Sequence, residues 1–315
     1  MKFGLMIMAR GPGGTGAGLG AMARAAEAGG LNFLAFNDHV VVPRSISSKY
    51  PYSNNGEWPG AATGDCLEMA TVASFLAATT DNIGLLTSVM VVPHRPVVLA
   101  AKMLATVDVL SGGRLTIGVG AGWMREEFES LGLPPFQERG IVTDEYIQGF
   151  KVLWTEENPY LSGRYVRFDG LVFEPKPVQK PHPPIWVGGE SAPAIRRAAQ
   201  LGDGWFPSNH NPTNLLDTPS RYAHGAAQLD EAANKAGRDP AEIHRAYLAF
   251  RPVNGKVRQG AHRHSLTGSP EAICDDIGQF SELGIETMVF FVSGTELNEI
   301  LDGISWLTGD VLPQT

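Results

Sequence analysis

Short apolar runs recur eight times along the 315 residues, and most are followed by a segment with apolar positions at helical spacing. Short apolar runs bounded by turn residues predict buried strands. Regular strand–helix alternation favours parallel strands joined by right-handed crossovers, and eight such units in this length favour a closed (β/α)8 TIM barrel over an open sheet. We therefore expect one α/β domain spanning residues 1–315. The predicted strands cover residues 2–8, 32–37, 83–92, 115–119, 185–187, 204–207, 243–250 and 287–292.

Two stretches break this alternation and are expected to be insertions into the barrel. Residues 40–65 are rich in Pro, Ser, Asn, Gly and Tyr and lack periodicity, which predicts a long loop of the kind that often carries function. Residues 155–184 contain Asp169-Gly170 between the apolar runs 165–168 and 171–173, which predicts a β-hairpin outside the barrel.

Charge and composition exclude several classes of protein. A net charge of −8 argues against nucleic-acid binding through a basic face. No run reaches the roughly 18 apolar residues of a membrane helix, and the apolar start, residues 1–7, is too short for a signal peptide. Cys66 and Cys274 lack metal-type spacing and are expected to be reduced. We expect a cytoplasmic protein with neither nucleic-acid nor membrane partners.

Polar side chains follow the second predicted strand, at the end where a barrel of this type builds its active site. Asp38 and His39 stand directly after residues 32–37. Histidine is the usual residue for proton transfer near neutral pH. An Asp–His hydrogen bond that merely shapes the following loop is an equal alternative at this point.

The segment Gly188-Gly189-Glu190-Ser191 follows the fifth predicted strand and precedes a predicted helix. Two glycines let the backbone approach a ligand closely, and a helix start offers unpaired N–H groups at the positive end of its dipole. Ser191 is also suited to cap that helix. The segment therefore predicts phosphate binding, with an ordinary capped turn as the alternative.

Two further motifs give weaker evidence for a binding site. Gly118, Gly120 and Gly122 alternate after the fourth strand, but Trp123 breaks the full dinucleotide spacing, so they indicate only that a flat ring could lie against the strand. His262-Arg263-His264 offers two histidines without a third ligand, which favours a solvated loop, and no metal site is expected.

Long ordered strings in the chain resemble the bacterial luciferase-like monooxygenase superfamily, and within it the coenzyme F420-dependent oxidoreductases. The resemblance runs through most of the chain. Its strongest strings are residues 95–96 (RP), 110–115 (LSGGRL), 118–123 (GVGAGW), 126–128 (EEF), 173–181 (FEPKPVQKP), 184–189 (PIWVGG) and 202–205 (GDGW).

The resemblance implies a barrel with insertions, a planar isoalloxazine-type ring at its mouth and a non-proline cis peptide at Ser88-Val89 under the ring. It also implies that His39 contacts the ring and takes part in proton transfer. The phosphate loop of the family maps onto residues 188–191. The implied cofactor contacts are Asp38, His39, Ser88, Val89, Met90, Gly120, Ala121, Gly122, Gly188, Gly189, Glu190 and Ser191.

One departure from the related enzymes concerns Trp123. Sugar-phosphate dehydrogenases of the group carry a glutamate general acid after the fourth-strand glycines, whereas this chain has Trp123, which argues against sugar-phosphate oxidation. Trp123, together with Trp58, Met90 and His39, indicates a partly apolar substrate pocket that suits an uncharged organic molecule.

These features predict a coenzyme F420-dependent oxidoreductase that transfers a hydride between the deazaflavin and a small organic substrate, with His39 as the proton donor or acceptor. One alternative is an FMN-dependent monooxygenase supplied with reduced flavin by a separate reductase. Another is a flavin-binding protein without catalysis. The resemblance further implies a homodimer.

Overall fold

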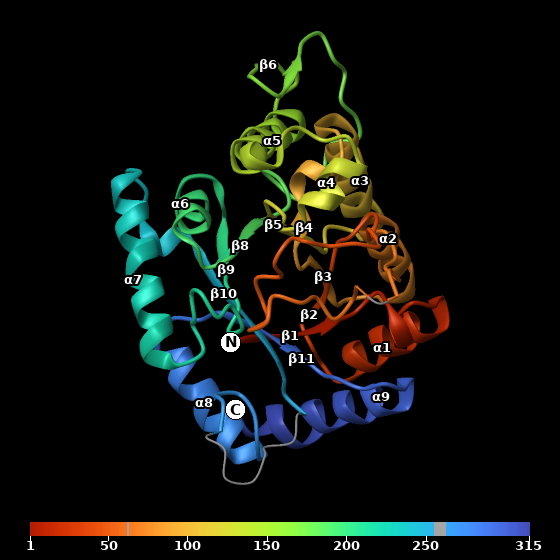
Figure 1. The fold of residues 1–315 in the computed structure, drawn as a ribbon, viewed down its shortest axis with the longest axis vertical. Coiled ribbons are helices and arrows are strands. Elements are labelled where there is room, and N and C mark those ends of the chain that lie inside the picture. Colours follow the sequence, from red (N-terminus) through yellow and green to blue (C-terminus); the bar gives the residue numbers. More distant parts are fainter. Residues whose placement is uncertain (62, 255–262) are drawn as a thin grey trace.

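The computed structural model describes residues 1–61, 63–254 and 263–315, and its strands form a closed barrel (Figure 1). The barrel order is β3-β2-β1-β11-β10-β9-β8-β5-β4, and pairing of β3 with β5 closes the ring with parallel neighbours throughout. The expected (β/α)8 architecture is confirmed. The strands of the ring are β1 (Lys2–Ile7), β2 (Phe33–Phe36), β3 (Gly84–Thr87), β4 (Met90–Val91), β5 (Leu115–Gly120), β8 (Ile185–Gly188), β9 (Gly204–Phe206), β10 (His244–Pro252) and β11 (Thr287–Phe291).

The third barrel position is split into two short strands. β3 pairs with β2 and with the start of β5, whereas β4 pairs with the end of β5. Between them lies the Ser88–Val89 peptide bond, which is cis. The non-proline cis bond implied by the resemblance is therefore present at the expected residues.

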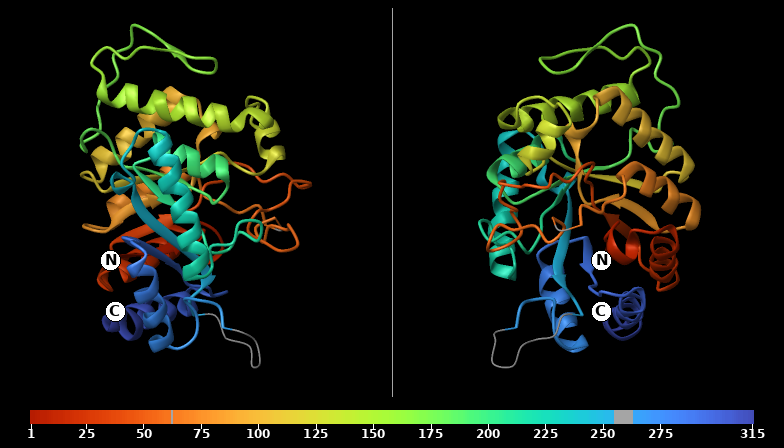
Figure 2. Two further views of the ribbon diagram at one scale, coloured as in Figure 1. Left: turned by 90° about the vertical axis from the view of Figure 1, so that its left-hand side faces the viewer. Right: turned by 45° about the vertical axis from the view of Figure 1, so that its right-hand side comes forward.

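Helices surround the strands in the order that the alternation predicts (Figures 1 and 2). Four of them begin at a Ser or Thr whose side-chain oxygen accepts a helix N–H, at Thr15, Ser191, Thr218 and Ser269. The helices are α1 (Gly16–Ala28), α2 (Met69–Thr79), α3 (Val97–Leu110), α4 (Arg125–Ser130), α5 (Arg139–Thr155), α6 (Ala192–Leu201), α7 (Pro219–Lys235), α8 (Pro270–Glu282) and α9 (Leu297–Trp306).

Two apolar layers account for the continuous apolar runs of the strands. Successive strand residues point to opposite faces, so Leu5 and Ile7 of β1 pack in the outer layer against the helices, while Met6 packs inside the barrel. The inner layer also contains Leu86, Trp186 and other buried side chains. Because both faces of each strand are buried, successive residues of these strands are apolar and the sequence shows no polar alternation.

The hairpin prediction was wrong in its position. The antiparallel pair joins β6 (Leu161–Ser162) to β7 (Arg167–Phe168), so its turn precedes Asp169-Gly170, and residues 171–173 form no strand. The carboxylate of Glu145 on α5 accepts the backbone N–H groups of Tyr165 and Val166. This contact from a distant helix holds the turn. Figure 2 shows the segment projecting beyond the barrel.

The long segment after β2 contains neither helix nor strand in residues 40–61 and 63–65, as expected for a loop. The His262-Arg263-His264 motif begins outside the described residues, and Arg263 itself pairs with Asp276 on α8. Within the part of the chain that the structure describes, no helix is both long enough and apolar enough to cross a membrane.

Candidate active site

A cavity of about 920 Å³ opens at the C-terminal ends of the strands, the end at which barrels of this type carry their active sites. Its walls come from the segments that follow β1, β2, β3, β5, β8 and β9, from residues within β4 and β10, and from residues between 47 and 58 of the long loop. Thirteen of the fourteen residues that the sequence predicted for the site line this cavity: Asp38, His39, Trp58, Ser88, Val89, Gly120, Ala121, Gly122, Trp123, Gly188, Gly189, Glu190 and Ser191.

Met90 is the exception. Its side chain is fully buried in the outer apolar layer, and it does not line the cavity. Because neighbouring strand residues face opposite sides of the barrel wall, the residue after Val89 turns away from the mouth. Met90 therefore belongs to the protein core and not to the pocket that the sequence suggested.

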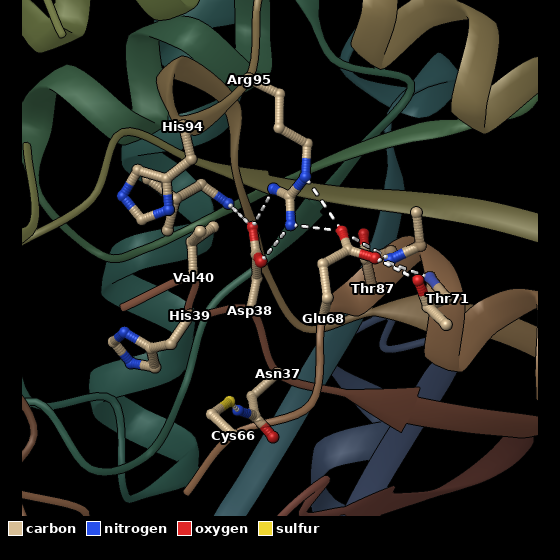
Figure 3. A network of polar contacts seen from close by, with 12 residues as sticks. Asn37, Asp38, His39, Val40, Cys66, Glu68, Thr71, Thr87, His94 and Arg95 are labelled. Carbon is tan, nitrogen blue, oxygen red and sulfur yellow. Dashed lines mark hydrogen bonds and ion pairs between the residues drawn. The ribbon is translucent and has the colours of Figure 1, made fainter. Parts of the chain in front are cut away.

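Asp38 lines the cavity and is held in a buried ion pair with Arg95 (Figure 3). Both of its carboxylate oxygens accept from the Arg95 guanidinium at 2.9 Å, and Oδ2 also accepts the backbone N–H of Val91 at 3.0 Å. Arg95 donates in addition to Glu68 at 2.7 Å. Burial disfavours the charge on Arg95, but its bonds to Asp38 and Glu68 outweigh this and raise its pKa.

This arrangement bears on the Asp–His hydrogen bond that was one interpretation of the pair. In the described part of the chain Asp38 makes no hydrogen bond to His39, and its oxygens are instead occupied by Arg95 and Val91. We conclude that Asp38 ties the end of β2 to the strand-three segment and so positions the next residue, His39.

His39 contacts a different carboxylate, that of Glu127 on α4. Nδ1 of His39 lies 2.9 Å from Glu127 Oε2, and Glu127 Oε1 accepts the backbone N–H of Val40 at 2.7 Å. Burial opposes the charge of Glu127, but the bond to His39 and the nearby His94 lower its pKa. An ionised carboxylate only accepts, so Nδ1 carries the hydrogen and Nε2 is left to take or give a proton.

Aromatic side chains form the wall beside His39. The Trp58 ring lies 4.4 Å from the imidazole between centroids, Trp123 lies 6.3 Å away, and Tyr50 packs on Trp123 at 5.1 Å. Burial raises the pKa of Tyr50 to about 12, so its hydroxyl is neutral at ordinary pH. Tyr50 and Tyr52 were not predicted, although both belong to the long loop expected to be functional.

The glycines of β5 and β8 make room for Val89. A methyl group on Gly120 would lie 2.8 Å from one Val89 methyl, and a methyl group on Gly188 would lie 2.8 Å from the other. The cis peptide segment thus packs between two glycines on neighbouring strands. Ser88 beside it has a buried hydroxyl with no hydrogen-bond partner among the described residues. A polar ligand atom above this segment would satisfy that hydroxyl.

Cationic side chains gather around the start of α6. Arg139 and Arg197 line the cavity together with Ser191, and burial together with the neighbouring Arg125 and Arg197 charges lowers the pKa of Arg139. Arg197 pairs with Asp144, whereas the acceptors of Arg139 among the described residues are the carbonyl oxygens of Gly122 and Phe136. Helix N-termini and guanidinium groups both favour anions. This end of the cavity suits a phosphate.

The Glu190 carboxylate is bound by the segment that follows β9. Its oxygens accept the backbone N–H of Ser208 at 2.6 Å and the side-chain amide of Asn211 at 2.8 Å. Burial raises the pKa of Glu190 to about 7, partly offset by these hydrogen bonds. A carboxylate facing a phosphate would repel it, so of the four loop residues Glu190 contributes a link to the β9 loop rather than a side chain for anions.

Three residues that shape the site escaped the sequence analysis. Glu127 and Arg95 lie in the strings that carry the resemblance and Arg139 lies outside them, yet none of the three has a local signature that separates it from the charged residues of a helix surface. Their roles follow from hydrogen bonds that form only in the folded chain, to His39, Asp38 and Gly122 respectively.

Comparison with known proteins agrees with this architecture. A model of the family described as luciferase-like monooxygenase matches residues 1–265. The FMNH2-dependent dimethylsulfone monooxygenase of Pseudomonas putida is 34% identical over 191 residues, 58% of this chain, and the match spans 52% of that enzyme, about half its length. An uncharacterized protein of Mycobacterium tuberculosis is 31% identical over 287 residues, 90% of this chain and 96% of that one.

A solved structure shows the same fold. The F420-dependent secondary alcohol dehydrogenase in complex with an F420–acetone adduct superimposes with a TM-score of 0.77 at 18% identity, covering 99% of this chain and 98% of that chain. The fold and the cavity at its mouth define a (β/α)8-barrel enzyme. The chain belongs to the luciferase-like monooxygenase family and is an oxidoreductase. Similar proteins include both F420-dependent and FMN-dependent enzymes.

Proposed function

We propose that this protein is a coenzyme F420-dependent oxidoreductase that transfers a hydride between the deazaflavin and a small organic substrate. The observation that carries the proposal is the Glu127–His39 pair, in which Nδ1 is held at 2.9 Å while Nε2 makes no hydrogen bond to the residues that the structure describes. Conversion between an alcohol and a carbonyl group moves a proton as well as a hydride, and a positioned imidazole is suited to carry that proton.

The residues of the cavity fit a planar cofactor with a phosphate group. The unpartnered Ser88 hydroxyl and the Val89 segment between Gly120 and Gly188 would hold the ring, and Arg139 with the α6 start would hold the phosphate. The bound deazaflavin would supply the hydride chemistry. Trp58 and Trp123 would exclude water from the reacting atoms.

An FMN-dependent monooxygenase is the second candidate. It is favoured by the 34% identity to the FMNH2-dependent dimethylsulfone monooxygenase, and it would need a separate reductase to deliver reduced flavin. The same cavity residues would hold FMN, since that cofactor also combines a flat ring with a phosphate. The homodimer expected from the resemblance stays a prediction.

A binding titration separates the two candidates. Purified protein is titrated with coenzyme F420 and with FMN, and tryptophan fluorescence is followed because Trp58 and Trp123 line the cavity. Binding of F420 at micromolar Kd, about −8 kcal/mol, without comparable binding of FMN supports the proposal. Preference for FMN overturns it in favour of the monooxygenase.

Two variants test the assigned roles. Arg139→Gln should weaken the preferred cofactor by about tenfold, because it removes a charge-assisted contact to the phosphate. His39→Gln should bind the cofactor within about twofold of the unmodified protein, yet reduce kcat by about 10²–10⁴-fold in a screen of alcohols and carbonyl compounds. If His39→Gln kept full turnover, the proton-transfer role would be refuted.

A further inference from the structure

Arg10 is a cationic cavity residue that the proposed function leaves without a role. It follows β1 and lines the main cavity, where its guanidinium lies 5.4 Å from the centre of the Trp58 ring. Its Nη1 also packs closely on Gly60, since a methyl group at that glycine would lie 2.1 Å away. Stacking on Trp58 and close contact with Gly60 hold the guanidinium in one place.

The charge of Arg10 is not neutralised within the described part of the chain. None of the ion pairs among residues 1–61, 63–254 and 263–315 includes it, whereas Arg197 in the same cavity pairs with Asp144. The nearby carboxylate of Asp65 accepts the backbone N–H of Gly11 instead. A guanidinium fixed in a cavity without a carboxylate partner favours an anionic ligand.

Arg10 also lies across the barrel from the phosphate end. Going round the ring from β1, three positions (β2, β3 and β5) precede β8 on one side, and three strands (β11, β10 and β9) precede it on the other. β1 and β8 are therefore opposite each other. A cofactor phosphate at Gly189 and the start of α6 would leave Arg10 available for a second anionic group.

A second, smaller cavity shares Met6, Met8 and Arg10 with the main one. It has a volume of about 290 Å³ and lies between β1, β11 and α9, with apolar walls that include Leu5, Met22, Phe291 and Ile300. Among the described residues that line it, Arg10 is the one charged side chain. One fixed cation at the mouth of an apolar cavity matches a ligand with an anionic head and an apolar body.

We propose that the substrate is an apolar 2-hydroxy acid, or the matching 2-oxo acid, whose carboxylate binds Arg10 between the two cavities. The carbon that bears the hydroxyl group would exchange the hydride with the deazaflavin, and the hydroxyl group would exchange the proton with His39. This inference rests on the proposed function and narrows its substrate class. The apolar body would occupy the smaller cavity, and the carbon beside the head group would face the main cavity, where Trp58 lies between Arg10 and His39. It differs from the sequence-based expectation of an uncharged substrate, which rested on Trp123, Trp58, Met90 and His39 and did not take Arg10 into account.

The test compares two ligands that differ only in the head group. Octanoate and 1-octanol are titrated calorimetrically into the full-length protein, with and without the cofactor that it prefers. The Kd of octanoate should be lower than that of 1-octanol by a factor of at least about ten, because a charge-assisted hydrogen bond to Arg10 is available only to the acid. Arg10→Gln should remove this preference and leave the affinity for 1-octanol within about twofold.

A matched control replaces an arginine outside both cavities. Arg24→Gln on α1 removes the same charge at an exposed position and should leave the preference for octanoate unchanged. Unchanged cofactor and 1-octanol affinities in Arg10→Gln show that the variant is folded. Equal affinities for acid and alcohol, no octanoate binding, or full retention of the preference in Arg10→Gln would each overturn the inference.

Failure of the two proposals is distinguishable. If neither F420 nor FMN binds while octanoate is preferred through Arg10, the proposed function falls and the assignment of Arg10 stands. If a cofactor binds but the acid and the alcohol do not differ, the assignment of Arg10 falls and the proposed function stands.

Discussion

Glu127 and His39 are 88 residues apart in the chain, yet their side chains meet at 2.9 Å between Oε2 and Nδ1. The carboxylate is almost completely buried, and its other oxygen accepts the backbone N–H groups of Val40 and Val41. One side chain therefore fixes both the imidazole and the start of the long loop that carries Tyr50 and Trp58 into the cavity.

Replacing this carboxylate tests whether it positions His39. Glu127→Gln keeps the shape but removes the charge that requires Nδ1 to carry the hydrogen. We expect kcat to fall by about 10²-fold or more with little change in cofactor affinity, as for other orienting groups of catalytic histidines. The double variant with His39→Gln should be no slower than His39→Gln alone. Additive losses in steady-state kinetics would show that Glu127 acts independently of His39.

The Asp38–Arg95 pair should matter mainly for stability. Arg95→Leu leaves Asp38 buried without a compensating charge, which costs about 3–5 kcal/mol of unfolding free energy for pairs of this kind. Urea unfolding followed by circular dichroism measures the loss. Arg24→Leu, at an exposed position on α1, should change stability by no more than about 0.5 kcal/mol. Equal effects of the two variants would contradict a structural role for the pair.

The contact between Gly120 and Val89 should make even a small side chain costly. Gly120→Ala places a methyl group 2.8 Å from Val89 Cγ2 and should destabilise the protein by about 1–3 kcal/mol while weakening cofactor binding. Adding Val89→Ala should restore part of the stability. Gly278→Ala is the matched control, because that glycine lies inside α8 with open space around it, and it should be neutral or stabilising by up to about 1 kcal/mol. A Gly120→Ala protein as stable as the control would refute the packing argument.

Glu190 should make stability fall as the pH rises. Its folded-state pKa of about 7 lies above the ordinary 4.5, so the folded state holds the proton more tightly than the unfolded chain. This contribution is fully present below pH 4.5 and is lost as the pH rises through about 7. Between pH 5 and pH 8 the unmodified protein should lose about 2–3 kcal/mol more unfolding free energy than Glu190→Gln. Parallel pH profiles of the two proteins in denaturant unfolding, measured without cofactor, would exclude this assignment.

The repeating pattern of apolar runs and helical segments determined the barrel without help from the structure. Both periodicities are local, because they follow from the backbone geometry of a strand or a helix and from burial of both strand faces. Strand ends are read from the same pattern, so Asp38, His39, Gly120 and residues 188–191 could be placed at one mouth of the barrel. The functional roles given to them stay predictions.

Only the tertiary structure decided which side chains form hydrogen bonds and ion pairs with each other. Glu127 reaches His39 across 88 residues, Arg95 reaches Asp38 across 57, and Glu145 holds a turn 20 residues away that the Asp-Gly signal had misplaced. A hydrogen bond depends on the distance and direction between two atoms, and no local period of the sequence encodes either for residues on different elements. The contact of Arg10 with Trp58 and Gly60 likewise became visible only in the folded chain, where distant segments share one cavity.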